Sequence, residues 1–146
     1  NIMMLADDSL GIIDFQDAVH GPITYDLASL LRDAYVAWPQ EQVEDWARLY
    51  FEKARTAGLI GAISDEQLML WFDWMGLQRH IKVVGIFARL NYRDGKTGYM
   101  RDIPRTFQYI RDVAGKYDAL QGFHQWLLHT LVPAIEAHEA KTESVS

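Results

Sequence analysis

The stretch LGIIDFQDAVHGPITYDLA, residues 10–28, decides the fold of this chain. It begins with an apolar, β-branched run that leads to Asp14, passes through the helix-breaking pair Gly21 and Pro22, and ends at the start of a helical pattern. A carboxylate that directly follows a buried strand is held on a rigid element with its oxygens directed outward, and such an arrangement suits Mg²⁺. The spacing alone fits equally well with Asp14 as a simple turn residue.

A β-hairpin is predicted around this stretch. Residues 2–5 and 10–15 are two apolar runs joined by the turn-rich sequence ADDS, so Asp14 is expected at the end of the second strand. The first run starts immediately after Asn1, as if a strand had already begun. We therefore expect that a preceding region of the protein lies outside this chain.

About five helices are predicted beyond the hairpin, because apolar residues recur there at steps of three and four. The strongest signal is a capping box at Ser64 and Gln67, which opens a long helix ending near Gly95. The other expected helices are residues 27–38, which Pro39 ends, residues 41–57, residues 104–117, and residues 123–135, which Pro133 should kink or shorten. Residues 1–135 are expected to form one lobe and residues 136–146 a frayed polar tail.

Composition limits the class of protein. The chain has 146 residues, of which 49% are hydrophobic and 23% charged, as expected for one compact domain. A net charge of -6 argues against a nucleic-acid partner, and no apolar run approaches the roughly 20 residues of a membrane span. The absence of cysteine excludes disulfides and thiolate metal sites, and with no signal-peptide pattern it favours a cytoplasmic protein.

The sequence DFQDA, followed by GP and YDLA, resembles the metal-binding segment of the aminoglycoside phosphotransferase and choline kinase superfamily. The resemblance is close over roughly the first thirty residues and loose over the helical remainder. It implies a mainly α fold with a small β-hairpin, namely the C-terminal lobe of a protein-kinase-like fold whose N-terminal lobe is missing from this chain. Gln16 replaces the flexible glycine of protein kinases, so no in–out switch of the neighbouring Phe15 is expected.

The resemblance also implies a set of site residues and the cofactors ATP and Mg²⁺. Asn1 and Asp14 would be the two protein ligands of the magnesium bound to ATP, and the catalytic aspartate of the pattern His-x-Asp-x-x-x-x-Asn would lie upstream of Asn1. Asp26 would support the catalytic loop through hydrogen bonds to backbone amides, although a favourable charge in the first turn of a helix explains it equally well. Asp17 would face the nucleotide or the substrate.

Within the superfamily, the chain looks most like bacterial kinases that phosphorylate the anomeric hydroxyl of N-acetylmuramate and N-acetylglucosamine in peptidoglycan recycling. Residues 76–82 and 85–90 are also similar to that subgroup. The resemblance therefore implies an ATP-dependent sugar kinase. This chain alone is expected to be inactive, because phosphoryl transfer depends on a lobe that positions ATP.

Arg79 lies on the apolar stripe of the third predicted helix, and a cation on a buried face needs a partner. One interpretation pairs it with Asp73, Asp102 or another internal carboxylate. The other places it in a sugar pocket with Gln78 and His80, where its guanidinium would bind the carboxylate of an acidic sugar.

Two alternative functions stay open at this stage. An aminoglycoside kinase would be expected to have more acidic residues in its substrate groove, and a non-catalytic helical interaction module would need none of the proposed ligands. Other signals are weak: the sequence DGKT at residues 94–97 lacks the upstream glycine of a phosphate loop, and no pair of histidines has the spacing of a zinc site. The five tryptophans are expected to be mainly core residues, with Trp38 and Trp74 the least clear.

Overall fold

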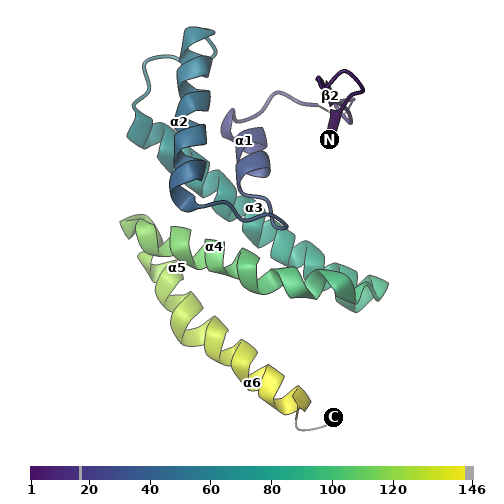
Figure 1. Cartoon of the computed structure of the whole chain (residues 1–146). Coiled ribbons are helices and arrows are strands. Elements are labelled where there is room, and N and C mark those ends of the chain that lie inside the picture. Colours follow the sequence, from purple (N-terminus) through teal and green to yellow (C-terminus); the bar gives the residue numbers. More distant parts are fainter. Residues whose placement is uncertain (17, 144–146) are drawn as a thin grey trace.

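The computed structural model describes residues 1–16 and 18–143, and it is mainly helical with one small hairpin (Figure 1). Asp17 lies outside the described residues. The elements are β1 (Ile2–Met4), β2 (Leu10–Ile12), α1 (Thr24–Leu31), α2 (Gln40–Thr56), α3 (Asp65–Asp94), the 3₁₀ turn η1 (Thr97–Asp102), α4 (Ile103–Lys116), the 3₁₀ turn η2 (Asp118–Leu120), α5 (Gln121–Trp126), the π-helical segment η3 (Leu127–Leu131) and α6 (Val132–Glu143).

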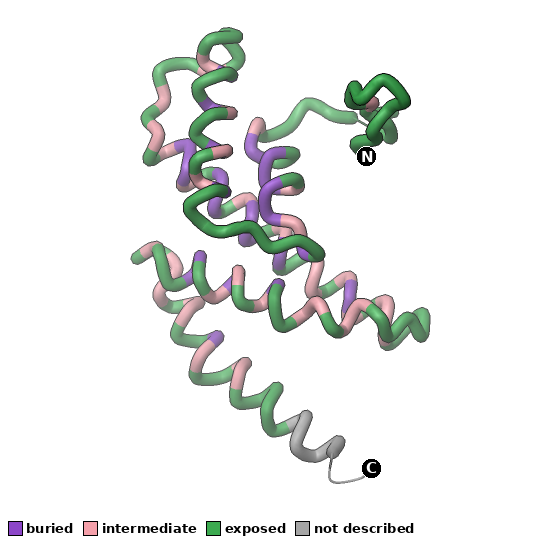
Figure 2. The backbone as a smooth tube through the Cα atoms, in the orientation of Figure 1, coloured by how far each residue is buried: buried purple, intermediate pink, exposed green. Residues whose placement is uncertain are grey.

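The predicted hairpin is present, with strands shorter than expected. The two strands are antiparallel and pair Ile2 with Ile12, and the last bond runs from the Ile13 N–H to the Asn1 carbonyl at 3.0 Å. The second strand therefore ends before Asp14, because its pairing partner ends at Asn1. Figures 1 and 2 show the hairpin standing apart from the helices with its surface exposed, and the side chain of Ile12 is 69% exposed.

Helix α3 is the central element, with α1 and α2 on one side and α4 and α5 on the other (Figure 1). Two separate apolar clusters form on these two sides. The first joins α1, α2 and α3 and includes Leu27, Ala28, Leu31, Val43, Ala47, Phe51, Leu68, Met69 and Phe72. The second joins α3, α4 and η3 and includes Leu77, Ile110, Val113, Ala114 and Leu127. Each cluster excludes water from one side of the same long helix.

The predicted boundaries of α3 are confirmed by its caps. The Ser64 hydroxyl accepts a hydrogen bond from the Gln67 N–H at 3.2 Å, and Asp65 and Glu66 occupy the first turn. At the other end Gly95 adopts a left-handed conformation with φ of 65°. Each cap is formed by residues within a few positions of the helix end, so both boundaries can be predicted from the sequence.

The first predicted helix is too long. We expected it to reach Trp38, whereas α1 ends at Leu31 and Arg32 turns the chain with φ of -124° and ψ of 53°. The Arg32 side chain is buried and forms an ion pair with Asp73 of α3. This long-range contact is the physical reason for the early end, because the apolar spacing beyond Leu31 is still helical.

Pro133, which we expected to kink or shorten the last helix, does not shorten it. Instead, η3 precedes it, and the Val132 N–H bonds to the Leu127 carbonyl in the π pattern. A π turn adds a residue to the helix and relieves the clash between a proline ring and the preceding turn. Helix α6 then continues to Glu143, into the segment that we predicted as a frayed tail. The remaining residues of that tail, 144–146, lie outside the described residues.

Candidate functional site

Asn1 and Asp14 meet at the open end of the hairpin. The Asn1 side-chain amide donates a hydrogen bond to Asp14 Oδ2 at 3.2 Å, although thirteen positions separate the two residues in sequence. The bond between the Ile13 N–H and the Asn1 carbonyl brings the two chain segments together. The hairpin therefore places side by side the two residues that the resemblance implied as metal ligands.

Asp14 has an uncommon backbone conformation. Its φ is 62°, a value that few residues other than glycine adopt, and that asparagine and aspartate tolerate best. The second carboxylate oxygen, Oδ1, accepts a hydrogen bond from Gln16 Nε2 at 2.8 Å. Two amide donors thus hold an exposed carboxylate in one orientation. Gln16, which replaces the protein-kinase glycine, has a direct contact with the candidate ligand.

The donor set of this pair fits magnesium. Carboxylate and amide oxygens are hard ligands, and Mg²⁺ is commonly held by one or two of them together with phosphate oxygens and water. Within the described residues, no group of three or more His, Cys, Asp or Glu side chains forms a metal cluster. Asn1 and Asp14 would therefore hold the ion incompletely, and a bound nucleotide would supply the remaining oxygens.

Asp26 lies in the first turn of α1 and is exposed. Tyr50 of α2 anchors the start of this helix, because its hydroxyl donates a hydrogen bond to the Ile23 carbonyl at 3.3 Å. Burial raises the pKa of Tyr50, and the carboxylate of Asp26 raises it further. The position of Asp26 suits the positive end of a helix dipole, and its role in supporting a catalytic loop stays a prediction.

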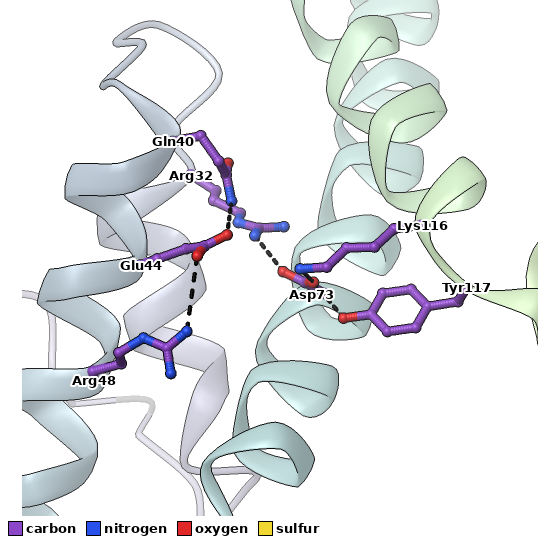
Figure 3. Close-up of polar contacts among 7 residues, drawn as sticks. All are labelled: Arg32, Gln40, Glu44, Arg48, Asp73, Lys116 and Tyr117. Atoms are coloured by element: carbon purple, nitrogen blue, oxygen red, sulfur yellow. Dashed lines mark hydrogen bonds and ion pairs between the residues drawn. The ribbon is translucent and has the colours of Figure 1, made fainter.

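A polar network joins the ends of α1 and α4 to α3 (Figure 3). At its centre is Asp73, which is fully buried. It forms an ion pair with Arg32, and it accepts hydrogen bonds from the Tyr117 hydroxyl and from Lys116 Nζ at 2.7 Å. Burial raises the pKa of Tyr117, and the hydrogen bond to Asp73 adds to this effect. Asp73 is thus the partner of Arg32 and Lys116 rather than of Arg79.

His80 is also buried, with 1% of its surface exposed. Its Nε2 bonds to the Arg32 carbonyl at 3.0 Å, which makes this nitrogen the protonated one, and its ring stacks on Tyr109 at 4.7 Å. Burial lowers the pKa of His80 to about 4, and the charges of Arg32 and Arg79 act in the same direction. The histidine predicted for a sugar pocket therefore lies in the core, beside the polar network.

Gln78 and Arg79 lie nearer the surface. Gln78 is exposed and lines a cavity beside residues 22–24, whereas Arg79 is half-buried with its guanidinium carbon 4.5 Å from the centre of the Tyr25 ring. Asp102 lies near Arg101 instead, at 3.8 Å. Within the described side chains Arg79 forms no ion pair. The structure thus brings Gln78 and Arg79 to the same region and separates His80 from them.

The expectation that the tryptophans are mainly core residues is wrong. Trp38, Trp71, Trp74 and Trp126 each expose more than two fifths of their surface, and only Trp46 is half-buried. Trp71 and Trp74 line the same cavity as Gln78, and the sequence interpretation missed them. A signal was present, since residues 71, 74 and 78 share one face of a helix.

Comparison with known proteins gives a family for the first part of the chain. Residues 1–59 match the model of the phosphotransferase enzyme family. This range contains the hairpin, Asn1, Asp14, α1 and α2. No solved structure gives a significant match.

Three similar proteins are bacterial and carry the same name, N-acetylmuramate/N-acetylglucosamine kinase. The protein of Neisseria meningitidis serogroup B is 50% identical over 126 residues, which are 86% of this chain and 38% of that protein. Those of Pseudomonas putida and Pseudomonas aeruginosa are 47% and 42% identical, over 78% and 92% of this chain. The chain spans 34% and 40% of the lengths of these two relatives.

These matches and the helical architecture confirm the predicted resemblance and the predicted fold class, a mainly α lobe with a small hairpin. No helix among the described residues is both long enough and apolar enough to cross a membrane.

Proposed function

This chain carries phosphotransferase-family sequence over residues 1–59, and on that premise we propose that it forms part of an ATP-dependent kinase that phosphorylates a sugar hydroxyl. The names of its relatives suggest N-acetylmuramate or N-acetylglucosamine as the acceptor. By resemblance to the predicted subgroup, the acceptor atom would be the anomeric hydroxyl. Cytoplasm is the proposed compartment because the reaction consumes ATP.

The observation that carries this proposal is the contact between Asn1 and Asp14 at the open end of the hairpin. Two oxygen-bearing side chains, fixed by backbone pairing and by Gln16, face solvent at a position where a nucleotide could approach. Magnesium, when bound there, would offset the negative charge of the phosphates. Asp14 and Asn1 would bind and orient the ion, and Asp26 would support the adjacent loop.

The chain spans only part of its relatives, so we propose that activity requires the remainder of such a protein. The aspartate that accepts the proton of the attacking hydroxyl is expected in that remainder. Phosphoryl transfer depends on positioning the acceptor, the phosphates and the metal together, and the described residues contribute only some of these groups. The isolated chain is therefore proposed to be inactive.

The test is an assay of the full-length protein that contains this chain, with ATP and Mg²⁺ against N-acetylmuramate, N-acetylglucosamine and an aminoglycoside. Asp14→Asn keeps the tolerance for a positive φ and removes the charge. We expect it to lower kcat by roughly 100-fold or more and to shift the Mg²⁺ requirement to higher concentration.

The matched control is Asp8→Asn, because Asp8 also has a φ of 62° and lies in the same hairpin at the turn. It should leave both kcat and the Mg²⁺ curve within about twofold of the wild type. The proposal fails if Asp14→Asn behaves like Asp8→Asn. If only the aminoglycoside is phosphorylated, the proposed sugar acceptor is wrong and the protein is an antibiotic kinase. No phosphorylation of any acceptor would favour the non-catalytic alternative.

A further inference from the structure

A cavity of about 430 Å³ lies between the start of α1 and one face of α3. Its wall is formed by residues 22–24 and by Trp71, Trp74, Met75 and Gln78. The volume is within the range of roughly 300–1,000 Å³ that small-molecule sites occupy, and a mostly apolar wall with a few polar groups is typical of them. Pro22 belongs to the loop that leads from Asp14 into α1, so the cavity adjoins the candidate metal segment along the chain.

The α3 side of this cavity is a single helix face. Trp71, Trp74, Met75 and Gln78 are spaced by three and four residues, so they are neighbours on the helix surface. Met75 packs against the first apolar cluster, whereas neither tryptophan belongs to either cluster. Both tryptophans are 43% exposed. Two large aromatic side chains are thus available to a ligand without being required by the core.

A half-buried cation is carried by the residue that follows the cavity residue Gln78 in sequence. Arg79 follows Gln78 in sequence, and its guanidinium lies over the ring of Tyr25, which follows the cavity residue Thr24. Such a cation–π contact holds the guanidinium in place without neutralising it. None of the described residues that line the cavity is acidic. The charge around the site therefore suits a neutral or anionic ligand and does not suit a polycation.

We propose that this cavity binds the pyranose ring of an N-acetylated amino sugar, with the ring against Trp71 and Trp74. One face of a pyranose presents C–H groups, which pack on the electron-rich face of an indole, while its hydroxyl and acetamido groups remain free for hydrogen bonds. Gln78 is the group that meets the acetamido substituent, since its amide can both donate and accept. Arg79 pairs with the carboxylate of an acidic sugar. This inference rests on the proposed sugar-kinase function.

The experiment measures kcat and KM of the full-length protein for N-acetylglucosamine and N-acetylmuramate. Trp71→Ala and Trp74→Ala should each raise KM for both sugars by about tenfold with little change in kcat, because the ring contact is made in the ground state. Arg79→Ala should raise KM for N-acetylmuramate alone. The matched control is Trp38→Ala: Trp38 has nearly the same exposure, 44%, and lines a different groove.

Direct binding separates this inference from the proposed function. Each variant is titrated with N-acetylglucosamine by calorimetry without ATP, and its melting temperature is measured to show that it is folded. Sugar binding that Trp74→Ala abolishes and Trp38→Ala retains supports the cavity, even if no sugar is phosphorylated. If Trp71→Ala and Trp74→Ala phosphorylate the sugar with unchanged KM, the proposed sugar site in the cavity is wrong, and the proposed kinase function is retained. Absence of both binding and phosphorylation overturns both.

Discussion

His80 is a single side chain that should make the stability of this fold depend on pH. Its ring is buried, its Nε2 bonds to the Arg32 carbonyl, and its Nδ1 has no partner among the described residues. Protonation would place a charge next to Arg32 and Arg79, and the hydrogen bond to the Arg32 carbonyl and the charge of Asp33 do not outweigh burial and this repulsion. Folding therefore favours the neutral form of the His80 imidazole.

The sign of the pH effect follows from the lowered pKa. Between about 4, the folded value, and 6.5, the ordinary value, the unfolded chain binds more protons at His80 than the folded chain does. Stability should therefore fall as pH falls through this window, with a contribution of at most about 1.4 kcal/mol per pH unit. Chemical denaturation at a series of pH values measures this slope.

His80→Gln provides the comparison, because glutamine can donate to the same carbonyl and does not titrate. We expect its free energy of unfolding to depend less steeply on pH between 4 and 6.5 than that of the wild type. The exposed His129, changed to Gln, should leave the slope unchanged. Equal slopes in His80→Gln and the wild type would contradict the buried neutral state.

At the same scale, the resemblance indicated which two side chains lie together in the hairpin, whereas the apolar pattern did not indicate which polar residues of α3 are buried. Asn1 and Asp14 were expected together on the basis of resemblance, and the structure places their side chains in contact. By contrast, the stripe expected on α3 followed the apolar residues, whereas its fully buried positions include Asp73, Gly76 and His80. Apolar spacing cannot reveal a buried carboxylate, because the partners that make its burial tolerable come from other elements.

At the scale of elements, α3 depends on a glycine that allows another chain segment to approach. A Cβ atom added at Gly76 would lie 2.9 Å from Arg32 Cδ and 3.1 Å from its Nη1. Arg32 cannot move aside freely, since its guanidinium is paired with Asp73. Gly85 lies nine residues further along the same helix, on its opposite face, and a Cβ atom added there would meet no other atom within 4 Å.

This contrast predicts opposite effects for the same substitution. Gly76→Ala should destabilise the protein by about 1–3 kcal/mol, because it displaces Arg32 from the ion pair. Gly85→Ala should stabilise it by up to about 1 kcal/mol, since alanine has the higher helix propensity. Urea denaturation of the two variants measures both effects. Stabilisation by Gly76→Ala would show that Arg32 is not held in place.

Element boundaries were predictable where the signal is local. The capping box and the terminal glycine gave both ends of α3, because each works within a few residues of the helix end. The end of α1 was not predictable, since the contact that fixes it joins Arg32 to a residue 41 positions away. The π segment before Pro133 was not predictable either, because a π turn has no composition signal.

At the scale of the whole molecule, Asp73 connects the two halves of the helical body. Its partners come from the end of α1 and the end of α4, and these two helices pack in different apolar clusters (Figure 3). Asp73→Asn should cost about 3–5 kcal/mol, because it leaves the buried Arg32 without a counter-charge. The free energy of unfolding from guanidinium titration measures this cost.

The control for this variant is Asp94→Asn. The Arg93–Asp94 pair is exposed, and its loss should leave the free energy of unfolding nearly unchanged. A cooperative single transition that shifts in Asp73→Asn and stays in place in Asp94→Asn would support a structural role for the network. Similar losses in the two variants would show that the network contributes no more than a surface pair.

The separation between the hairpin and the helices affects the distance between the two proposed binding sites. In the described part of the chain, the hairpin stands apart from the helices and is connected to them by the segment that leads to α1 (Figure 1). The cavity is lined by residues 22–24, at the end of that segment, and by residues of α3. Under the proposed function, the length of that segment would set the distance between a nucleotide bound at the hairpin and a sugar bound in the cavity. Changes of length between residues 18 and 21 would therefore alter which hydroxyl of the sugar lies near the phosphate, while the hairpin and the residues that line the cavity stay the same.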